Sequence, residues 1–257
     1  NIVVDYYRNV DDVERWTPWS KPIVDAPADR NTRHVGQFGT KNFELSSMKY
    51  QSWWHDIELR PGSDASIINM VTEIPMYYTP KMEVHKHKPG NPIIQDTNSD
   101  GSPRYYTYGV PFFNYGLIPK TWEDPDVKSS RGYGGDNDPL DVIELGSMPL
   151  EMGSITPCRV LGSLELIDEG ETDHKILCLA STDRDFSRIH SLDDLERTKP
   201  GYLDKLRDWL KRYKTSDGKA ENELASDFPR SVAEAIGVID EMNKSWQQLC
   251  SSAFYSI

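Results

Sequence analysis

The chain has 257 residues, of which 37% are hydrophobic and 11% aromatic, so it carries enough apolar bulk for a globular core. Its formal net charge is −12 at pH 7. This charge argues against nucleic-acid binding by simple counterion release, which requires a basic surface. A phosphate substrate is still compatible with it, because carboxylates that first bind divalent cations can then attract an anion.

Cysteine usage and hydropathy bear on the cellular location of the protein. The three cysteines, at positions 158, 178 and 250, are too widely spaced for a disulfide framework or a CxxC metal site, which favours a reducing compartment. No stretch reaches the ~18 apolar residues of a membrane span, so we expect no membrane partner. The chain begins with Asn1, and a targeting segment would be out of view. We therefore expect a cytoplasmic location, or an organelle or acidic vacuole lumen if a longer precursor is processed.

Residues 1–48 are polar and contain three closely spaced prolines, so we interpret them as an N-terminal extension lying over the main body. Residues 49–257 are expected to form a single catalytic domain. Apolar alternation then predicts strands, which turns at Gly90, Gly101, Gly135 and Gly170 separate. The predicted strands are 67–73, 81–87, 104–108, 141–145, 156–166 and 175–180.

The C-terminal third changes to a helical period. Leu206, Trp209 and Leu210 belong to one apolar stripe, which follows Pro200 and Gly201, and residues 232–249 carry a second stripe. Many short strands followed by helices predict an α+β fold with a β-barrel core. We expect the barrel over about residues 50–190 and the helices over about 191–250.

The strongest local signal is the segment 135–142, GDNDPLDV. In an extended backbone Asp136 and Asp138 point to the same side, and a bend at Pro139 lets Asp141 rejoin them. Two carboxylates ~4 Å apart repel by roughly 4 kcal/mol at an effective dielectric near 20, so convergence predicts bound cations. Oxygen ligands without His or Cys favour Mg²⁺ or Mn²⁺. A solvated acidic turn is the alternative that this segment alone leaves open.

A second acidic segment, 168–173, lies between two predicted strands and precedes Lys175. Two acidic turns at one barrel mouth would supply enough carboxylates for several metals. Glu73, Lys81 and Glu83 add charges to predicted strands, although a surface ion pair is the ordinary interpretation of such a lysine. The groups suited to gripping phosphate are Lys81, Arg104, Tyr115, Lys175, Tyr213 and Lys214.

Carboxylates combined with these cations indicate metal-assisted phosphoryl transfer, in which a metal-activated hydroxide is the nucleophile. The chain lacks the GxxxxGK[ST], GxGxxG and GxSxG motifs, which argues against nucleotide, dinucleotide and serine-hydrolase sites. The tract from His85 to Lys88 is interpreted as an exposed strand or loop, with a transition-metal site as the alternative for His85 and His87.

With these residues in view, the chain closely resembles the soluble family I inorganic pyrophosphatases of the eukaryotic type. The segment 135–142 fits the family signature, and further blocks agree in order and spacing over roughly residues 50–250. Those blocks are NMVTEIP (69–75), KMEV (81–84), NPIIQDT (91–97), NYGLIPKTWEDP (114–125), DEGETD (168–173) and YKTSDGK (213–219). Two features depart from the family pattern: His174 stands where relatives often carry Trp, and residues 1–48 have no clear counterpart.

The resemblance implies hydrolysis of pyrophosphate to two orthophosphates in an OB-like five-stranded barrel. Three to four Mg²⁺ ions are implied as cofactors, with Mn²⁺ or Zn²⁺ as substitutes. Asp136, Asp141 and Asp173 resemble the ligands of the tightest metals, and Asp141 would bridge two of them. Asp168 and Glu83 resemble ligands of the ions that arrive with substrate.

The remaining candidates follow from the same resemblance. Asp138 matches the residue that orients and deprotonates the nucleophilic water. Glu73 and Lys175 match charged residues of the same cavity, so Glu73 is counted with the metal ligands and Lys175 with the catalytic residues. The catalytic residues that also bind substrate phosphate would be Lys81, Arg104, Tyr115, Tyr213 and Lys214.

Two other functions are weighed against pyrophosphate hydrolysis. One is hydrolysis of short polyphosphate, such as tripolyphosphate, with other divalent metals. The other is a non-catalytic scaffold that binds divalent cations. In either case the expected state is a homodimer or a higher homo-oligomer, and the resemblance supports the dimer.

Overall fold

The computed structural model describes residues 32–35, 44–47, 52–226 and 228–254. Of the predicted N-terminal extension it describes only β1 (Thr32–Val35) and β2 (Glu44–Ser47), which pair antiparallel. The expectation that the extension lies over the main body otherwise falls outside the described residues.

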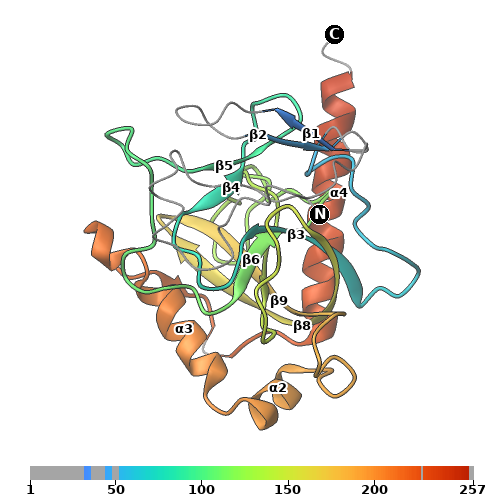
Figure 1. Ribbon diagram of the computed structural model, residues 1–257, viewed down its shortest axis with the longest axis vertical. Helices are drawn as coiled ribbons and strands as arrows, with labels where there is room; N and C mark the ends of the chain where they lie inside the picture. The colour runs from blue at the N-terminus through green and yellow to red at the C-terminus, as the bar shows by residue number, and fades with distance from the viewer. Residues whose placement is uncertain (1–31, 36–43, 48–51, 227, 255–257) are drawn as a thin grey trace.

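Five strands close into a ring at the centre of the molecule (Figure 1). The order around the ring is β8-β3-β6-β7-β9, and β9 pairs back to β8. Only β7 and β9 run parallel among these neighbours. Closure removes free sheet edges and leaves a packed interior, and it confirms the predicted barrel. The ring consists of β3 (Ile67–Ile74), β6 (Asn114–Leu117), β7 (Asp141–Glu144), β8 (Ile155–Asp168) and β9 (Glu171–Ala180).

The long strand β8 pairs with both of its neighbours in the ring. Its first part pairs with β3 and its second part with β9, and the β8–β9 register shifts between Val160 and Gly162. Such an irregularity bends a strand and increases its twist, which barrel closure requires. Two short additions flank the ring: β10 (Glu223–Leu224) extends β8, and β4 (Met82–Val84) pairs with β5 (Ile93–Gln95) in a separate hairpin.

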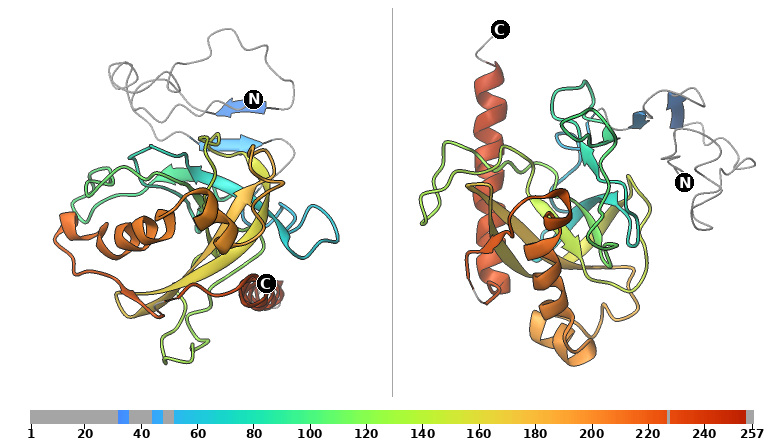
Figure 2. Two further views of the ribbon diagram at one scale, coloured as in Figure 1. Left: turned by 90° about the horizontal axis from the view of Figure 1, so that it is seen from below. Right: turned by 90° about the vertical axis from the view of Figure 1, so that its left-hand side faces the viewer.

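The helices cover two different sides of the ring (Figure 2). On one side α4 (Val232–Phe254) packs Ala235 and Ile239 into a buried cluster that contains Met70 and Val142. On the other side lie α2 (Leu192–Thr198) and α3 (Tyr202–Arg212), followed by the 3₁₀ turn η2 (Thr215–Asp217). The two predicted helices are therefore confirmed, and none of the described helices has the length and apolar character needed to cross a membrane.

Two predicted strands were wrong in extent. The strand expected over 81–87 is only β4, and 104–108 forms no strand but a single bridge between Tyr105 and Pro80. Proline at 80 and 103 removes backbone donors, so a continuous ladder cannot form there. Both β6 and α2 escaped sequence analysis because four and seven residues are too short to show a period.

Because side chains alternate along a strand, some charged residues point to the same face of the barrel as apolar core residues. On β7, Asp141 shares a face with Ile143, and on β9, Lys175 shares a face with Leu177. Asp141 and Lys175 are also register partners across the parallel pair. Ile143 and Leu177 belong to the cluster that α3 covers. The same face is thus apolar toward α3 and charged where the strands begin.

Candidate active site

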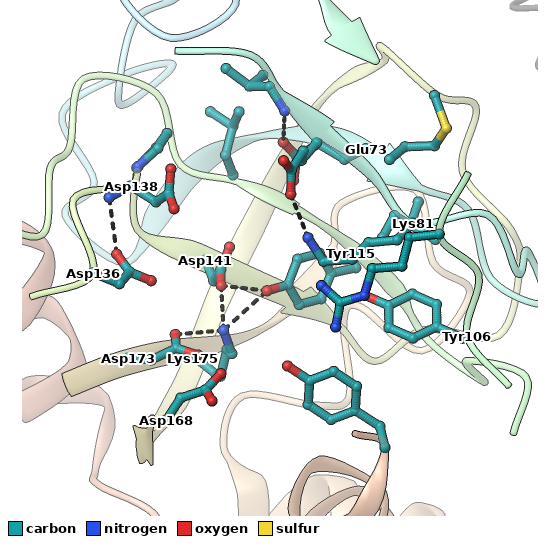
Figure 3. A pocket seen from close by; sticks show the side chains of 18 of the residues that line it. Glu73, Lys81, Tyr106, Tyr115, Asp136, Asp138, Asp141, Asp168, Asp173 and Lys175 are labelled. Atoms are coloured by element: carbon teal, nitrogen blue, oxygen red, sulfur yellow. Dashed lines mark hydrogen bonds and ion pairs between the residues drawn. The ribbon is translucent and has the colours of Figure 1, made fainter. Parts of the chain in front are cut away.

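A cavity of about 220 Å³ opens beside the start of β7 and β9 (Figure 3). Segments far apart in sequence contribute to it, from β3 to the end of α3. Every site residue predicted from the sequence lines this cavity, so the structure brings all of them together. They are Glu73, Lys81, Glu83, Arg104, Tyr115, Asp136, Asp138, Asp141, Asp168, Asp173, Lys175, Tyr213 and Lys214.

The inner wall of the cavity consists of Tyr115, Asp141, Asp173 and Lys175. The Lys175 ammonium donates to Asp141, to Asp173 and, at 3.0 Å, to the Tyr115 hydroxyl, which itself donates to Asp141 (Figure 3). Lys175 is only 4% exposed. Burial alone would lower the pKa of Lys175, but Asp141 and Asp173 outweigh it and raise that pKa well above its usual value. This wall is therefore a tightly paired cluster, in which one buried ammonium joins two carboxyl groups and a tyrosine hydroxyl.

A tight loop holds Asp136 and Asp138. The Asp138 amide donates to Asp136 Oδ1 at 2.9 Å, and Asn137 between them has a left-handed φ of 66°. Two backbone hydrogen bonds of 2.9 Å tie this loop to Glu123, from the Asn137 amide and to the Asp138 carbonyl. A Cβ on Gly135 would lie 2.5 Å from the Glu123 carbonyl group, so only glycine permits this approach.

The two aspartates of this loop differ in their surroundings. Burial, followed by the charges of Glu123 and Asp173, raises the pKa of Asp136 to about 10. Asp138 is 45% exposed and forms an ion pair of 2.8 Å with Lys86. Its position in the acidic cavity raises the pKa of Asp138 through partial desolvation, and Lys86 opposes that rise. We call Asp138 and Lys86 the rim of the cavity.

The carboxylates of this site suit a hard cation. One oxygen each from Glu123, Asp136 and Asp173 lies within 4.8 Å of the others. Burial, opposed in part by Lys175, raises the pKa of Asp173 to about 6. Oxygen-only donors in this number fit Mg²⁺ or Mn²⁺ and give no soft ligand for copper or iron. Asp141 lies outside this group; Lys175 and Tyr115 donate to its Oδ2.

Cationic side chains occupy the opposite side of the cavity, each beside an acid. Lys81 pairs with Glu83 and, at 3.2 Å, with Asp96. Burial alone would lower the pKa of Lys81, but the neighbouring acids and Tyr106 raise it.

Arg104 donates to Asp96 at 3.0 Å, and Lys214 pairs with Asp168. Tyr213 stacks on Trp209 with a centroid distance of 4.9 Å. Fixed cations next to a carboxylate cluster can bind the oxygens of a substrate that is itself polyanionic.

Sequence reasoning missed several residues of this site. Asp96 and Tyr106 contact the cationic side, Lys86 pairs with Asp138, and Glu123 lies behind the Asp136 loop. Lys86 belongs to the tract that was interpreted as an exposed strand or loop, and this tract forms a turn after β4, with His87 exposed. For Glu123 the only signal was its place in the block 114–125.

A closed five-stranded barrel whose mouth gathers carboxylates and phosphate-binding cations defines a class of metal-dependent phosphohydrolases. A family-wide sequence profile described as Inorganic pyrophosphatase matches residues 70–247. The inorganic pyrophosphatase of Zygosaccharomyces bailii is 39% identical over 227 residues, which cover 85% of this chain and 79% of that protein. The chain therefore belongs to the inorganic pyrophosphatase family.

Solved structures agree with this assignment. The type I inorganic pyrophosphatase from Toxoplasma gondii is 35% identical with a TM-score of 0.79, covering 85% of this chain and 98% of that one. The N-terminally truncated vacuolar soluble pyrophosphatase of Trypanosoma cruzi, solved in complex with PPi, is 32% identical with a TM-score of 0.77, covering 89% of this chain and 95% of that one. These likenesses confirm the OB-like barrel.

Proposed function

We propose that this chain hydrolyses inorganic pyrophosphate to two orthophosphates and uses Mg²⁺ to do so. The observation that carries the proposal is the cavity itself, in which Asp136, Asp138 and Asp141 face a set of fixed cations. Family membership and the pyrophosphate complex of the Trypanosoma cruzi relative support the same substrate.

We propose that three to four Mg²⁺ ions bind in the acidic part of the cavity, with Mn²⁺ or Zn²⁺ as substitutes. When bound, such ions neutralise phosphate charge, polarise the bridging bond and lower the pKa of an attacking water. The residues that would hold them are Asp136, Asp141, Asp168, Asp173, Glu73 and Glu83. Glu73 is buried, its carboxylate accepts from the Val84 amide at 2.7 Å, and burial raises its pKa well above the usual value. That environment favours a neutral carboxyl until a cation is near.

The chain's own residues then bind the substrate and move the proton. Lys81, Arg104 and Lys214 bind phosphate oxygens, and the hydroxyls of Tyr115 and Tyr213 donate to them. Asp138 accepts the proton of the attacking water, since its carboxylate lines the cavity and is 45% exposed to solvent. Lys175 holds Asp141 and Asp173 in place and balances the charge that develops on the leaving phosphate.

The test is phosphate release from pyrophosphate with Mg²⁺, with a chelator, and with Asp138→Asn. We expect the chelator to abolish release and the substitution to lower kcat by about 10²–10⁴, the usual contribution of a positioned base. Asp126→Asn, in an exposed loop outside the cavity, is the matched control and should leave kcat unchanged. Release that survives both chelation and Asp138→Asn contradicts the proposal.

Assembly and location are finer parts of the same proposal. A homodimer or higher homo-oligomer is supported by large apolar side chains on the surface, such as Tyr77 and Met148, which are 60% and 62% exposed. Light scattering of the purified chain tests it, and a monomer at micromolar concentration contradicts it. The cytoplasm, or the lumen of an organelle or acidic vacuole, is the proposed location, and fractionation of tagged cells tests it.

A further inference from the structure

Glu123 is an acid of the site region to which the mechanism above gives no role. It follows β6 in the chain and lies against the loop that carries Asp136. Its side chain is 1% exposed. A carboxylate is rarely buried this completely unless it is paired or bound to a metal.

The two oxygens of Glu123 are in different situations. Oε1 accepts from the backbone amide of His174 at 3.1 Å and is 2.7 Å from His174 Nδ1. Oε2 is buried and has no hydrogen-bond partner among the described residues. Buried polar atoms without a partner are uncommon in folded proteins, and each one calls for a specific explanation. A cation is the partner that an ionised oxygen accepts most readily.

Asp136 and Asp173 show the same division between their oxygens. The Asp138 amide donates to Oδ1 of Asp136, and Lys175 donates to Oδ1 of Asp173. Within the part of the chain that the structure describes, the hydrogen bonds of each of these carboxylates fall on one oxygen only. The donors thus orient all three groups and leave a second oxygen on each.

The spacing of the three carboxylates fits a single ion. One oxygen of each lies within 4.8 Å of the others. Oxygens bound to Mg²⁺ at about 2.1 Å lie roughly 3 to 4 Å apart around an octahedron. Closing from 4.8 Å needs small movements of side chains that are already oriented. Without a cation, three acids this close together either repel one another or keep protons, and a bound cation removes both costs.

We propose that Glu123 is a direct ligand of a divalent cation, which it shares with Asp136 and Asp173. The assignment rests on the proposed function only for the presence of the metal. His174 acts as a positioning residue, because its amide and Nδ1 hold the Glu123 carboxylate so that Oε2 is free to bind. Asp136 and Asp173 line the cavity, and Glu123 approaches them from outside its lining.

The first test is crystallography of the unmodified chain with Mn²⁺ and without pyrophosphate. Anomalous scattering at the manganese edge locates the ion. We expect a peak with oxygens of Glu123, Asp136 and Asp173 each at about 2.1 to 2.3 Å. An ion bound by Asp136 and Asp173 with Glu123 more than about 3 Å away overturns the assignment. This test needs no variant, so a folding defect cannot obscure it.

The second test is Mn²⁺ binding in solution, followed by electron paramagnetic resonance on chelator-treated protein. Glu123→Gln keeps the shape and the His174 contact but removes the charge. We expect it to weaken one Mn²⁺ site by at least about tenfold, since even outer partners of metal ligands contribute 10- to 100-fold. Unchanged affinity overturns the assignment.

The matched control is Glu165→Gln. Glu165 is buried, lies opposite His174 in the β8–β9 register and pairs with Arg230. The Glu165→Gln substitution removes an equal charge close to His174. It should change the Mn²⁺ affinity by less than about threefold, because a carboxylate that does not touch the ion acts on it only through its electrostatic field. An equal loss in both variants shows a field effect and overturns direct ligation.

These measurements also separate this assignment from the proposed function. Both are made without pyrophosphate and read the ion rather than turnover. Binding through Glu123 in a protein that releases no phosphate from pyrophosphate supports the site and contradicts the function. Normal hydrolysis of pyrophosphate by a protein whose bound ion is not contacted by Glu123 supports the function and contradicts the site.

Discussion

Lys175 and Lys86 each pair with a carboxylate of the same cavity, but Lys175 is 4% exposed and Lys86 is 24% exposed. Lys175 lies on β9, where the register with β7 places it beside Asp141. Lys86 lies in a turn after β4 and reaches an aspartate that is itself 45% exposed. The inner wall is therefore built by a sheet, and the rim is built by loops.

The two regions should respond differently to salt, metal and mutation. A buried pair is little screened, and removing one partner leaves a charge that water cannot reach. An exposed pair is screened by salt and contributes little to stability. The inner wall thus holds its charged side chains in place before a ligand binds. At the rim, Lys86 adjusts the pKa of the solvent-facing Asp138.

The largest expected effect comes from the inner wall. Lys175→Met leaves Asp141 and Asp173 facing each other without their shared cation. We expect the free energy of unfolding to fall by about 3–5 kcal/mol with a chelator present, as for other broken buried pairs. Mg²⁺ should restore part of this loss, because it neutralises the same carboxylates. Urea denaturation with chelator and with Mg²⁺ measures both values.

The comparison between the two regions fails if Lys175 behaves like a rim residue. A loss below about 1 kcal/mol, typical of exposed pairs, would mean that water screens the inner wall as well. A large loss that Mg²⁺ does not reduce would show that the cation site lies elsewhere.

The aspartate loop is expected to give the next largest effect, through its backbone. In Gly135→Ala the new Cβ would meet the Glu123 carbonyl group at 2.5 Å, so the loop must move. We expect a loss of about 1–3 kcal/mol in unfolding free energy, as for other overpacked sites.

The matched control for this loop is Gly237→Ala in α4, where a Cβ meets nothing within 4 Å. It should raise the unfolding free energy by about 0.5–1 kcal/mol, because alanine is the better helix former. Thermal unfolding of both variants gives the sign of each change. Equal effects in the two variants would contradict the close approach at Gly135.

The inner wall was more predictable from sequence than the rim. Apolar residues follow Asp141 and Lys175 directly, so both strands were visible in the sequence, whereas their parallel pairing was not. Lys86 and Glu123 lie in segments with no period, and only the folded chain shows that they meet the aspartate loop. The prediction of a strand over 104–108 was wrong because it too depended on contacts that only the folded chain shows. The tyrosines of this segment favour a strand locally, but the prolines at 80 and 103 allow only isolated bridges.

The acidic cluster should also make stability depend on pH. The pKa of Asp136 is raised to about 10 in the folded state, so this carboxyl keeps a proton that the unfolded chain loses near pH 4. The folded state therefore binds more protons, and stability falls as pH rises. Between pH 7 and 8.5 we expect Asp136 alone to cause a loss of up to about 1.4 kcal/mol per pH unit in chelator, and Glu73, whose pKa burial also raises, adds to that loss. His174, whose pKa burial lowers, does not titrate in this window.

Melting temperatures across that range, in chelator, measure the slope. Asp136→Asn should make the slope shallower, because the amide has no proton to keep or lose. Saturating Mg²⁺ should also flatten it in the unmodified chain, since a cation takes the place of the proton. Stability that rises with pH in chelator would contradict the crowding of acids at this site.

The rim should give the smallest change in stability and a distinct change in activity. Lys86→Met should cost less than about 1 kcal/mol, because the pair is exposed. Lys86 opposes the raised pKa of Asp138, so its removal should move the acid limb of the kcat/KM profile to higher pH. The shift should shrink near 1 M salt, where the Debye length is about 3 Å. Lys88→Met removes the same charge from the same turn and should leave the profile in place. A shift of equal size in both variants, or one that persists in high salt, would show that the rim does not act through this ion pair.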